Sequence, residues 1–339
     1  MRKTIQLLLA LFFCGIIMSG SGAAEEPTQQ IDEQATAQAP WNKGEIIIKN
    51  PSFHTNFFGV TTQGLYLAQE FYLDGKKLSD PYLSICPDKM TDKDKFWEAC
   101  KKTGPLVAWY PNGQKMAEGR YQDGKLHGLW TRGNQTGQKI MEERYQDGKK
   151  QGLWTQWNHN GKKYEEGHYK DDKRQGLWTV WYYDGQKAVE GRYQDYKKHG
   201  LWTEWDKNGK KSREGHYQDD KKYGLWTEWD KNGQKCSEKR YQDDKKQGLW
   251  ILWDENGNKR EEGRYQDDKK HGLWIEWYKN GNGQKWEEAH YQNDKKHGLL
   301  THYHHNGRKF AEGLYKNGER HGLWILWDNN GNEIRREKY

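Results

Sequence analysis

The chain has 339 residues, of which 33% are hydrophobic, 31% are charged and 14% are aromatic, including 19 Trp and 21 Tyr. This apolar content is too low for an ordinary large globular core, and the aromatic content is too high for a disordered chain. The formal charge is +7, but basic and acidic residues are interspersed, so we expect no basic surface for nucleic acid and no nucleic-acid partner.

Residues 1–24 have the pattern of a signal peptide. Arg2 and Lys3 precede an apolar stretch, and small residues follow it up to Ala24. We therefore expect cleavage after Ala24 and a periplasmic or secreted mature chain. Cys14 follows the bulky Phe13, where a lipoprotein cleavage site needs a small residue, so we expect no lipid anchor. No later segment has the ~20 apolar residues of a transmembrane helix.

Two segments precede the periodic part of the sequence. Residues 25–40 are rich in Gln, Ala, Thr and Glu without hydrophobic periodicity, so we predict a flexible linker. Residues 41–103 contain strand-like apolar runs and a helix-start pattern at Thr91. We interpret this segment as an irregular capping region, because an open repeat array must protect its terminal strand. Cys86 and Cys100 lie within it and could form a disulfide in an oxidising compartment.

From residue 104 the sequence is periodic. One glycine, called here the marker glycine, recurs every 24 residues and is then delayed by two residues, because a second Asn-Gly pair follows Asn280–Gly281. A fixed period of this length is typical of a repeat architecture. Residues 104–339 therefore form ten repeats, and their marker glycines are Gly104, Gly128, Gly152, Gly176, Gly200, Gly224, Gly248, Gly272, Gly298 and Gly322.

Each repeat contains two strand-sized segments. In the repeat that begins at Gly200 the pair Asn208–Gly209 separates them, and this pair predicts a β-hairpin with a type I′ turn. The connection to the next repeat is Asp219–Asp220, where Asp tolerates left-handed geometry. The predicted fold class is all-β. It is an elongated single-sheet antiparallel meander of tandem 24-residue β-hairpin repeats, with a small irregular N-terminal capping region.

The aromatic residues have fixed places in the repeat. Sixteen of the tryptophans stand two or five residues after a marker glycine, so we expect aromatics on both faces of the sheet. The closing Tyr shares a face with the Gly two residues before it, and such a glycine leaves room for a neighbouring ring. Exposed rings would form an interaction patch. The candidate partner-binding surface consists of Trp154, Trp178, Trp202, Trp226, Trp250 and Trp274.

No catalytic, phosphate-binding or dinucleotide-binding motif stands out in the sequence. His302, His304 and His305 offer ring nitrogens, but neighbours in a strand face opposite ways and no cysteine or carboxylate cluster accompanies them. Glu166, Glu190 and equivalent residues recur along a ladder, whereas a glycosidase needs one distinct pair in a cleft. We therefore expect no catalytic residues, no metal and no cofactor, and a protein that is not an enzyme.

The unit starts Gly-Leu-Trp, turns at Asn-Gly, continues to Glu-Gly and closes with Tyr before Asp-Gly. This pattern resembles the MORN repeat, specifically its shorter bacterial variant, over residues 104–339. The resemblance implies protein interaction, scaffolding and sometimes lipid contact, and it supplies no catalytic residues. Bacterial chains with this repeat are often grouped with the YwqK-like antitoxin family, whose members are proposed partners of toxins. The export signal is a departure from a cytoplasmic antitoxin.

Two functions follow as hypotheses. The first is a repeat scaffold outside the cytoplasm that binds a protein partner, antitoxin-like by resemblance, so that the partner would be a toxin. The second is a glycan or cell-wall binding module, in which rings of successive repeats, about 10 Å apart, suit an extended ligand. A hydrolase ranks last, because no catalytic pair is recognisable.

Overall fold

The structure is a computed structural model that describes residues 30–37, 39, 43–49, 51–87, 99–279 and 283–339. The expected signal peptide and the helix predicted at Thr91 lie outside the described residues. The chain divides into two compact units, Met1–Cys100 and Lys101–Tyr339. In the described ranges, no helix has the length and apolar character needed to cross a bilayer.

The first unit contains a small antiparallel sheet and a one-turn helix, α1. Strand β3 pairs with β1, β2 and β4, and β4 pairs with β5. Phe58, Leu67 and Phe71 form its buried core. The elements are β1 (Ile31–Asp32), α1 (Glu33–Ala37), β2 (Ile46–Lys49), β3 (Phe53–Thr61), β4 (Tyr66–Tyr72) and β5 (Tyr82–Ile85).

Residues 31–37, which the sequence placed in a flexible linker, form β1 and α1 instead. Asp32 caps the helix, because its Oδ1 accepts a hydrogen bond from the Ala35 N–H at 2.9 Å. Thr36 is buried, and its Oγ1 accepts a hydrogen bond from the Val60 N–H at 2.8 Å. The Asp32 cap and the buried Thr36 hydrogen bond thus order this segment, and a search for hydrophobic periodicity misses such contacts.

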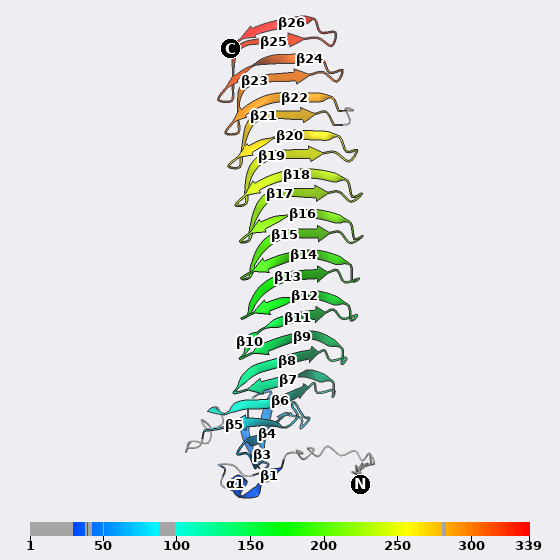
Figure 1. Cartoon of the computed structure of the whole chain (residues 1–339). Helices are drawn as coiled ribbons and strands as arrows, with labels where there is room; N and C mark the ends of the chain where they lie inside the picture. Colours follow the sequence, from blue (N-terminus) through cyan, green and yellow to red (C-terminus); the bar gives the residue numbers. More distant parts are fainter. Residues whose placement is uncertain (1–29, 38, 40–42, 50, 88–98, 280–282) are drawn as a thin grey trace, which may run out of the picture. The chain divides into compact units, whose positions relative to one another are not determined.

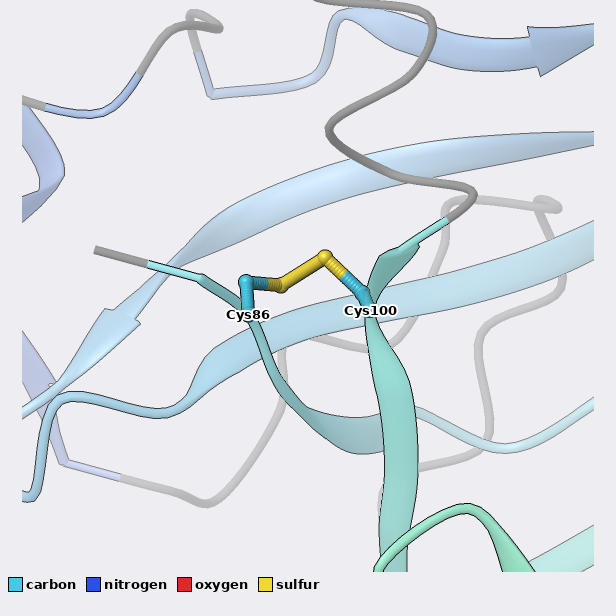
Figure 2. The surroundings of a disulfide bond; sticks show 2 residues. All are labelled: Cys86 and Cys100. Atoms are coloured by element: carbon cyan, nitrogen blue, oxygen red, sulfur yellow. A yellow bond between two sulfur atoms is a disulfide. The ribbon is translucent and has the colours of Figure 1, made fainter. Parts of the chain in front are cut away.

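Cys86 and Cys100 are joined by a disulfide (Figure 2). The bond closes a loop between residues separated by 14 positions in the sequence. Cys86 lies directly after β5, and Cys100 is the last residue of the first unit. The disulfide therefore ties the end of the first unit to its last strand.

The second unit is an array of hairpins, which follow one another from β6 to β26 (Figure 1). Its strands are β6 (Lys101–Trp109), β7 (Lys115–Gln122), β8 (Lys125–Gly133), β9 (Lys139–Gln146), β10 (Lys149–Lys150), β11 (Gly152–Trp157), β12 (Lys163–Lys170), β13 (Lys173–Trp181), β14 (Lys187–Gln194), β15 (Lys197–Trp205), β16 (Lys211–Gln218), β17 (Lys221–Trp229), β18 (Lys235–Gln242), β19 (Lys245–Trp253), β20 (Lys259–Gln266), β21 (Lys269–Trp277), β22 (Lys285–Gln292), β23 (Lys295–Tyr303), β24 (Lys309–Lys316), β25 (Glu319–Trp327) and β26 (Glu333–Lys338).

Strands of the array pair with their neighbours in the sequence, and the pairing is antiparallel. The register repeats from hairpin to hairpin: Trp202 lies opposite Gly215, and Trp226 lies opposite Lys239 at the equivalent position. The predicted all-β meander of tandem hairpins is confirmed. Such an array has no central core, because each hairpin packs only on its neighbours.

The connection between repeats is a two-residue turn. Asp219 and Asp220 have φ of 51° and 69°, and the flanking residues Gln218 and Lys221 pair with each other. Positive φ at both central residues defines a type I′ turn. Asp220 also links its turn to the preceding turn between repeats, because its Oδ1 accepts a hydrogen bond from the Lys198 N–H at 2.8 Å.

The Asn-Gly turn differs from the prediction. Gly209 has φ of +76°, but Asn208 is not in the left-handed region, so the predicted type I′ turn is wrong at this position. The Gly209 N–H donates to the Asp206 carbonyl at 3.0 Å, as in a type I turn followed by a left-handed glycine. Asp206 favours this turn, because its Oδ1 accepts from the N–H groups of Asn208 and Lys210.

Candidate binding surface

The array has two faces of different composition. In the repeat that begins at Gly200, Trp202 lies opposite Gly215, while the next residues along the two strands bring Thr203 opposite Glu214. Side chains alternate between faces along a strand. We call the face of Trp202 the indole face, and the face that carries Thr203 and Leu201 the leucine face.

On the indole face, glycine provides the space for most of the tryptophans. A Cβ atom built on Gly215 would lie 2.1 Å from the Trp226 ring, far inside van der Waals contact. The ring covers the backbone of the preceding strand, and its Nε1–H donates to the His216 carbonyl at 3.1 Å. The close approach predicted from the sequence is confirmed here.

Rings and cations form a continuous packing on this face. Tyr217 contacts Trp226 edge-on, with ring centroids 5.0 Å apart, and Trp202 lies 5.8 Å from Tyr217 on its other side. The Lys222 ammonium lies 4.8 Å from the Trp226 ring centroid. Burial lowers the pKa of Lys222. Edge-to-face pairs and cation–π contacts therefore replace an aliphatic core.

The indole face contains all six tryptophans that the sequence assigned to a partner-binding surface. Trp154, Trp178, Trp202, Trp226 and Trp274 are only 1% to 6% exposed, and Trp250 is partly buried. At Trp178, Trp202, Trp226 and Trp274 glycine backbone lies under the ring and a lysine or arginine lies over it, as Gly191 and Lys198 do at Trp202. The prediction is wrong for the five buried rings, because packing between repeats covers them.

Two repeats lack the glycine under the next tryptophan. Six tryptophans donate an Nε1 hydrogen bond to the preceding strand: Trp130, Trp178, Trp202, Trp226, Trp274 and Trp324. The two tryptophans that follow a larger residue in place of glycine form no such hydrogen bond among the described residues. Trp154 follows Glu143, and its Nε1 has no partner in the described part of the chain. Trp250 follows Lys239, whose ammonium lies 5.1 Å from its ring.

Glu143 is a buried carboxylate at this unusual position. Arg132 Nη2 and Lys150 Nζ each lie 3.1 Å from its oxygens, and its side chain is 1% exposed. The distances define ion pairs, but neither oxygen has an aligned hydrogen bond. Burial, followed by the Glu143 charge, raises the pKa of Tyr145 to about 12. This arrangement holds a charge among rings and offers no open site.

A second set of contacts ties successive repeats together on the leucine face. Lys211 donates to Glu214 at 2.6 Å, and Thr203 Oγ1 donates to the same carboxylate at 2.9 Å. The Lys211 ammonium also lies 5.9 Å from the Trp229 ring of the next repeat. Burial alone would raise the pKa of Glu214, but the two hydrogen bonds outweigh it and lower the pKa below its usual value.

The leucine face also contains an exposed row, which we call the leucine–arginine strip. Each pair is a leucine one residue after the marker glycine and the basic residue or histidine opposite it. The pairs are Leu129–Arg144, Leu153–His168, Leu177–Arg192, Leu201–His216, Leu225–Arg240, Leu249–Arg264 and Leu273–His290. Except for Leu249, these leucines are 37% to 48% exposed, and all the partners are exposed.

Sequence reasoning missed this strip. Leu follows the marker glycine in nine of ten repeats, but on its own this leucine is only one element of the repeat pattern. The signal that could have found it is the combination of an apolar residue and a basic residue at two strand positions of the same face. An exposed apolar row beside cations is a recognisable interaction feature.

The three histidines of the diverged repeat do not converge on one point. His302 Nε2 lies 2.7 Å from Glu287, and His304 Nε2 lies 3.0 Å from the Trp327 carbonyl. His305 stacks on Tyr278, with centroids 3.7 Å apart. Across the described ranges, no group of three or more His, Cys, Asp or Glu side chains is placed to hold a metal.

A column of carboxylates crosses the indole face beside the repeat that contains His302. Glu276 lies opposite Glu261 on one side and opposite Glu287 on the other. Burial, followed by the Glu287 charge, raises the pKa of Glu276. Lys270 offsets the repulsion, with Nζ 3.0 Å from Glu261 and 4.0 Å from Glu276. The column is thus a compensated ion-pair network.

Comparisons with known proteins recognise the repeat. Five stretches match the family described as "MORN repeat variant": residues 150–171, 198–219, 222–243, 246–267 and 296–317. No curated protein matches the chain. One similar solved structure is a chain of the "Crystal Structure of TcdB2-TccC3-Cdc42", with 11% identity over 81% of this chain and a TM-score of 0.17. Our chain spans 16% of the length of that chain.

Proposed function

We propose that the protein is a non-enzymatic repeat scaffold that binds a protein partner through the leucine–arginine strip. The observation that supports it most is the exposed leucine in successive repeats, as at Leu177 and Leu201. A row of apolar side chains beside cations buries apolar area and supplies charge at the same time, as protein interfaces do. The five stretches that match the MORN repeat variant support a repeat scaffold.

The partner class follows from resemblance and from the N-terminal sequence. Grouping with antitoxins makes a toxin the first candidate, and the signal-like residues 1–24 place the encounter in the periplasm or outside the cell. Genes next to this one would supply the candidate toxins for co-purification. Sequencing the mature N-terminus tests export: a chain that begins near Glu25 supports it, and a chain that keeps Met1 contradicts it.

The experiment for the strip compares two double variants of the full mature chain in pull-downs from envelope extracts. Leu177→Glu with Leu201→Glu changes the strip, where the leucines are 46% and 48% exposed. Tyr183→Glu with Ile334→Glu changes residues elsewhere that are more exposed than these leucines, at 61% and 60%. A partner retained by the wild type and the control but lost by the strip variant supports the proposal. Equal retention by all three chains contradicts it.

A glycan ligand is the second candidate, and a different row of tryptophans supports it. Trp181, Trp205 and Trp229 lie on the leucine face and are only partly buried, so one ring surface could meet a sugar. Co-sedimentation with insoluble cell-wall polysaccharide tests it. Pelleting should decrease when Trp205→Ala and Trp229→Ala are combined. Unchanged pelleting of that variant removes the case for ring stacking.

A further inference from the structure

The arginines of the strip have no acidic partner among the described residues. Arg120, which lies opposite Pro105 at the equivalent position of the first repeat, extends the row of Arg144, Arg192, Arg240 and Arg264. All five are exposed, and none forms an ion pair among the residues that the structure describes. An arginine fork presents donors that match a carboxylate in two parallel hydrogen bonds. One such fork in each of five repeats is therefore available to a ligand.

Nearby carboxylates are already occupied. The closest acidic residue along the same strand and face as Arg192 is Glu190, two residues earlier. Its carboxylate accepts hydrogen bonds from Lys187 at 2.6 Å and from Thr179 at 3.2 Å. The same Lys–Glu pair stands beside the other four arginines, as at Lys235 and Glu238. The lysines of this face are thus neutralised within the sheet, while the arginines are not.

Acidic residues are missing from the strip itself. The positions opposite the nine leucines and Pro105 carry Arg or Lys in six repeats, His in three and Leu in one, and the position before the marker glycine carries His, Gln, Tyr or Thr. At neutral pH the strip is therefore positively charged at six positions, and each of these charged residues lies opposite an apolar residue. Charge complementarity calls for a ligand that is acidic and carries apolar groups at the same spacing.

The spacing narrows the shape of that ligand. Equivalent positions of adjacent repeats are two strands apart, or about 9.6 Å. Arginines occupy adjacent repeats at Arg240 and Arg264 and alternate repeats at Arg192 and Arg240, so their separations are one or two such steps. A polyproline II segment has three residues per turn and rises ~3.1 Å per residue, so every third side chain returns to one side after about 9.3 Å. A β-strand repeats a face every ~6.7 Å, and two helical turns take ~10.8 Å. The extended polyproline II form matches the array best.

We propose that the leucine–arginine strip binds an extended acidic segment of the partner, which carries one carboxylate at every third residue. The carboxylates pair with arginines such as Arg192 and Arg240, and apolar residues of the segment cover leucines such as Leu177 and Leu225. This inference rests on the proposed function, because it specifies the partner of the same strip.

The width of the strip favours a single chain over a lipid bilayer. Beside the leucines runs a row of Lys–Glu ion pairs, such as Lys211 and Glu214, and in several repeats a threonine such as Thr203 donates to the same glutamate. A flat anionic membrane that reached the leucines would have to dehydrate this row as well, which is costly for charged groups. A single extended segment can lie on the strip and leave the row in water.

Fluorescence polarisation with a labelled peptide of six Pro-Glu-Leu triplets tests the inference. At ~3.1 Å per residue the peptide spans about six repeats. The full mature chain should bind it and should not bind the same peptide with Gln in place of Glu. A third peptide of identical composition has its six Glu residues grouped at one end, and it should bind more weakly.

Matched protein variants locate the site. Arg192→Gln, Arg240→Gln and Arg264→Gln together should weaken binding about tenfold or more, as expected for three carboxylate pairs. Lys207→Gln, Lys231→Gln and Lys279→Gln remove the same charge from exposed residues of the Asn-Gly turns and should leave binding within about twofold. Circular dichroism of both variants verifies that the sheet is intact.

Several results would overturn the inference. The first is that the Pro-Glu-Leu peptide does not bind. The second is that the grouped peptide binds as tightly as the Pro-Glu-Leu peptide. The third is that the arginine and lysine variants lose the same amount of affinity. Binding only to phosphatidylglycerol vesicles or only to polygalacturonate would assign the strip to a membrane or to an acidic glycan instead. A partner captured through the leucines while the peptide fails would leave the proposed function standing. If the peptide binds but the Leu177→Glu, Leu201→Glu variant still captures the partner, the inference about the acidic segment stands and the proposed function fails.

Discussion

Gly215 and Trp226 form one structural unit, although they belong to different hairpins. The indole lies directly on the glycine, where a Cβ atom would approach it to 2.1 Å, and its Nε1–H donates to the carbonyl of His216. The repeat with Ala289 in the glycine position is followed by Leu300 and not by tryptophan. Both members of the pair are replaced in that repeat, whereas Glu143 and Lys239 replace only the glycine and leave Trp154 and Trp250 in place.

A double-mutant cycle on this pair should reveal the coupling. Gly215→Ala alone should lower the free energy of unfolding by about 1–3 kcal/mol, because the methyl group forces the ring away. In a Trp226→Leu background the same change should cost almost nothing, as in the natural pair Ala289 and Leu300. Urea unfolding of the four chains gives the coupling energy. Equal costs of Gly215→Ala in both backgrounds would contradict the packing described here.

Lys239→Gly should restore the regular contact in a repeat that lacks it. Without the side chain, the Trp250 ring can lie on the backbone and donate Nε1–H to the Arg240 carbonyl. We expect the Trp250 indole proton to exchange more slowly, by about 1 kcal/mol in local opening free energy, while Trp202 serves as an internal reference. An unchanged exchange rate at Trp250 would mean that Lys239 does not displace its ring. Selectively labelled tryptophan resolves the two protons by NMR.

Acid should weaken the array through its carboxylates. Lys211 and Thr203 lower the pKa of Glu214 against the opposing effect of burial. A lowered pKa means that the folded state holds fewer protons than the unfolded state near the ordinary pKa of Glu. Its contribution is therefore fully present above that ordinary pKa and is lost as the pH falls through the lowered folded value. Glu228, Glu287 and Glu288 are shifted in the same direction.

The measurement is urea unfolding of the wild type and of Glu214→Gln at neutral and acid pH. The variant should be less stable than the wild type at neutral pH, and the difference should shrink in acid because both chains then carry a neutral group at this position. A difference that stays constant with pH would exclude the ion pair as its source.

Loss of the disulfide should affect the first unit alone. Closing a loop of about 15 residues stabilises a folded unit by roughly 3 kcal/mol, so Cys86→Ser with Cys100→Ser should increase hydrogen exchange in β3, β4 and β5. The array contains Cys236 as its free cysteine and serves as the internal reference. Equal increases of exchange in the array and in the first unit would show that the bond acts on more than its own unit.

Much of the fold could be read from local sequence. The 24-residue period, the two strands of each repeat and the glycine beneath the ring follow from turn residues and from the alternation of side chains. Local pattern also failed at particular residues. It placed the type I′ turn at Asn208–Gly209, whereas Asp206 there imposes a different turn and Asp219–Asp220 adopt the primed form.

The sequence by itself determined which residues share a face of each hairpin, because alternation is a property of the backbone. Only the tertiary structure decided which face is covered. Trp226 is buried because a neighbouring hairpin supplies Gly215 below it and Lys222 lies above it, while Leu201 remains exposed because no part of the array lies over it. Hydrophobicity alone ranks both as core residues. Contacts between repeats bury one of them and leave the other exposed.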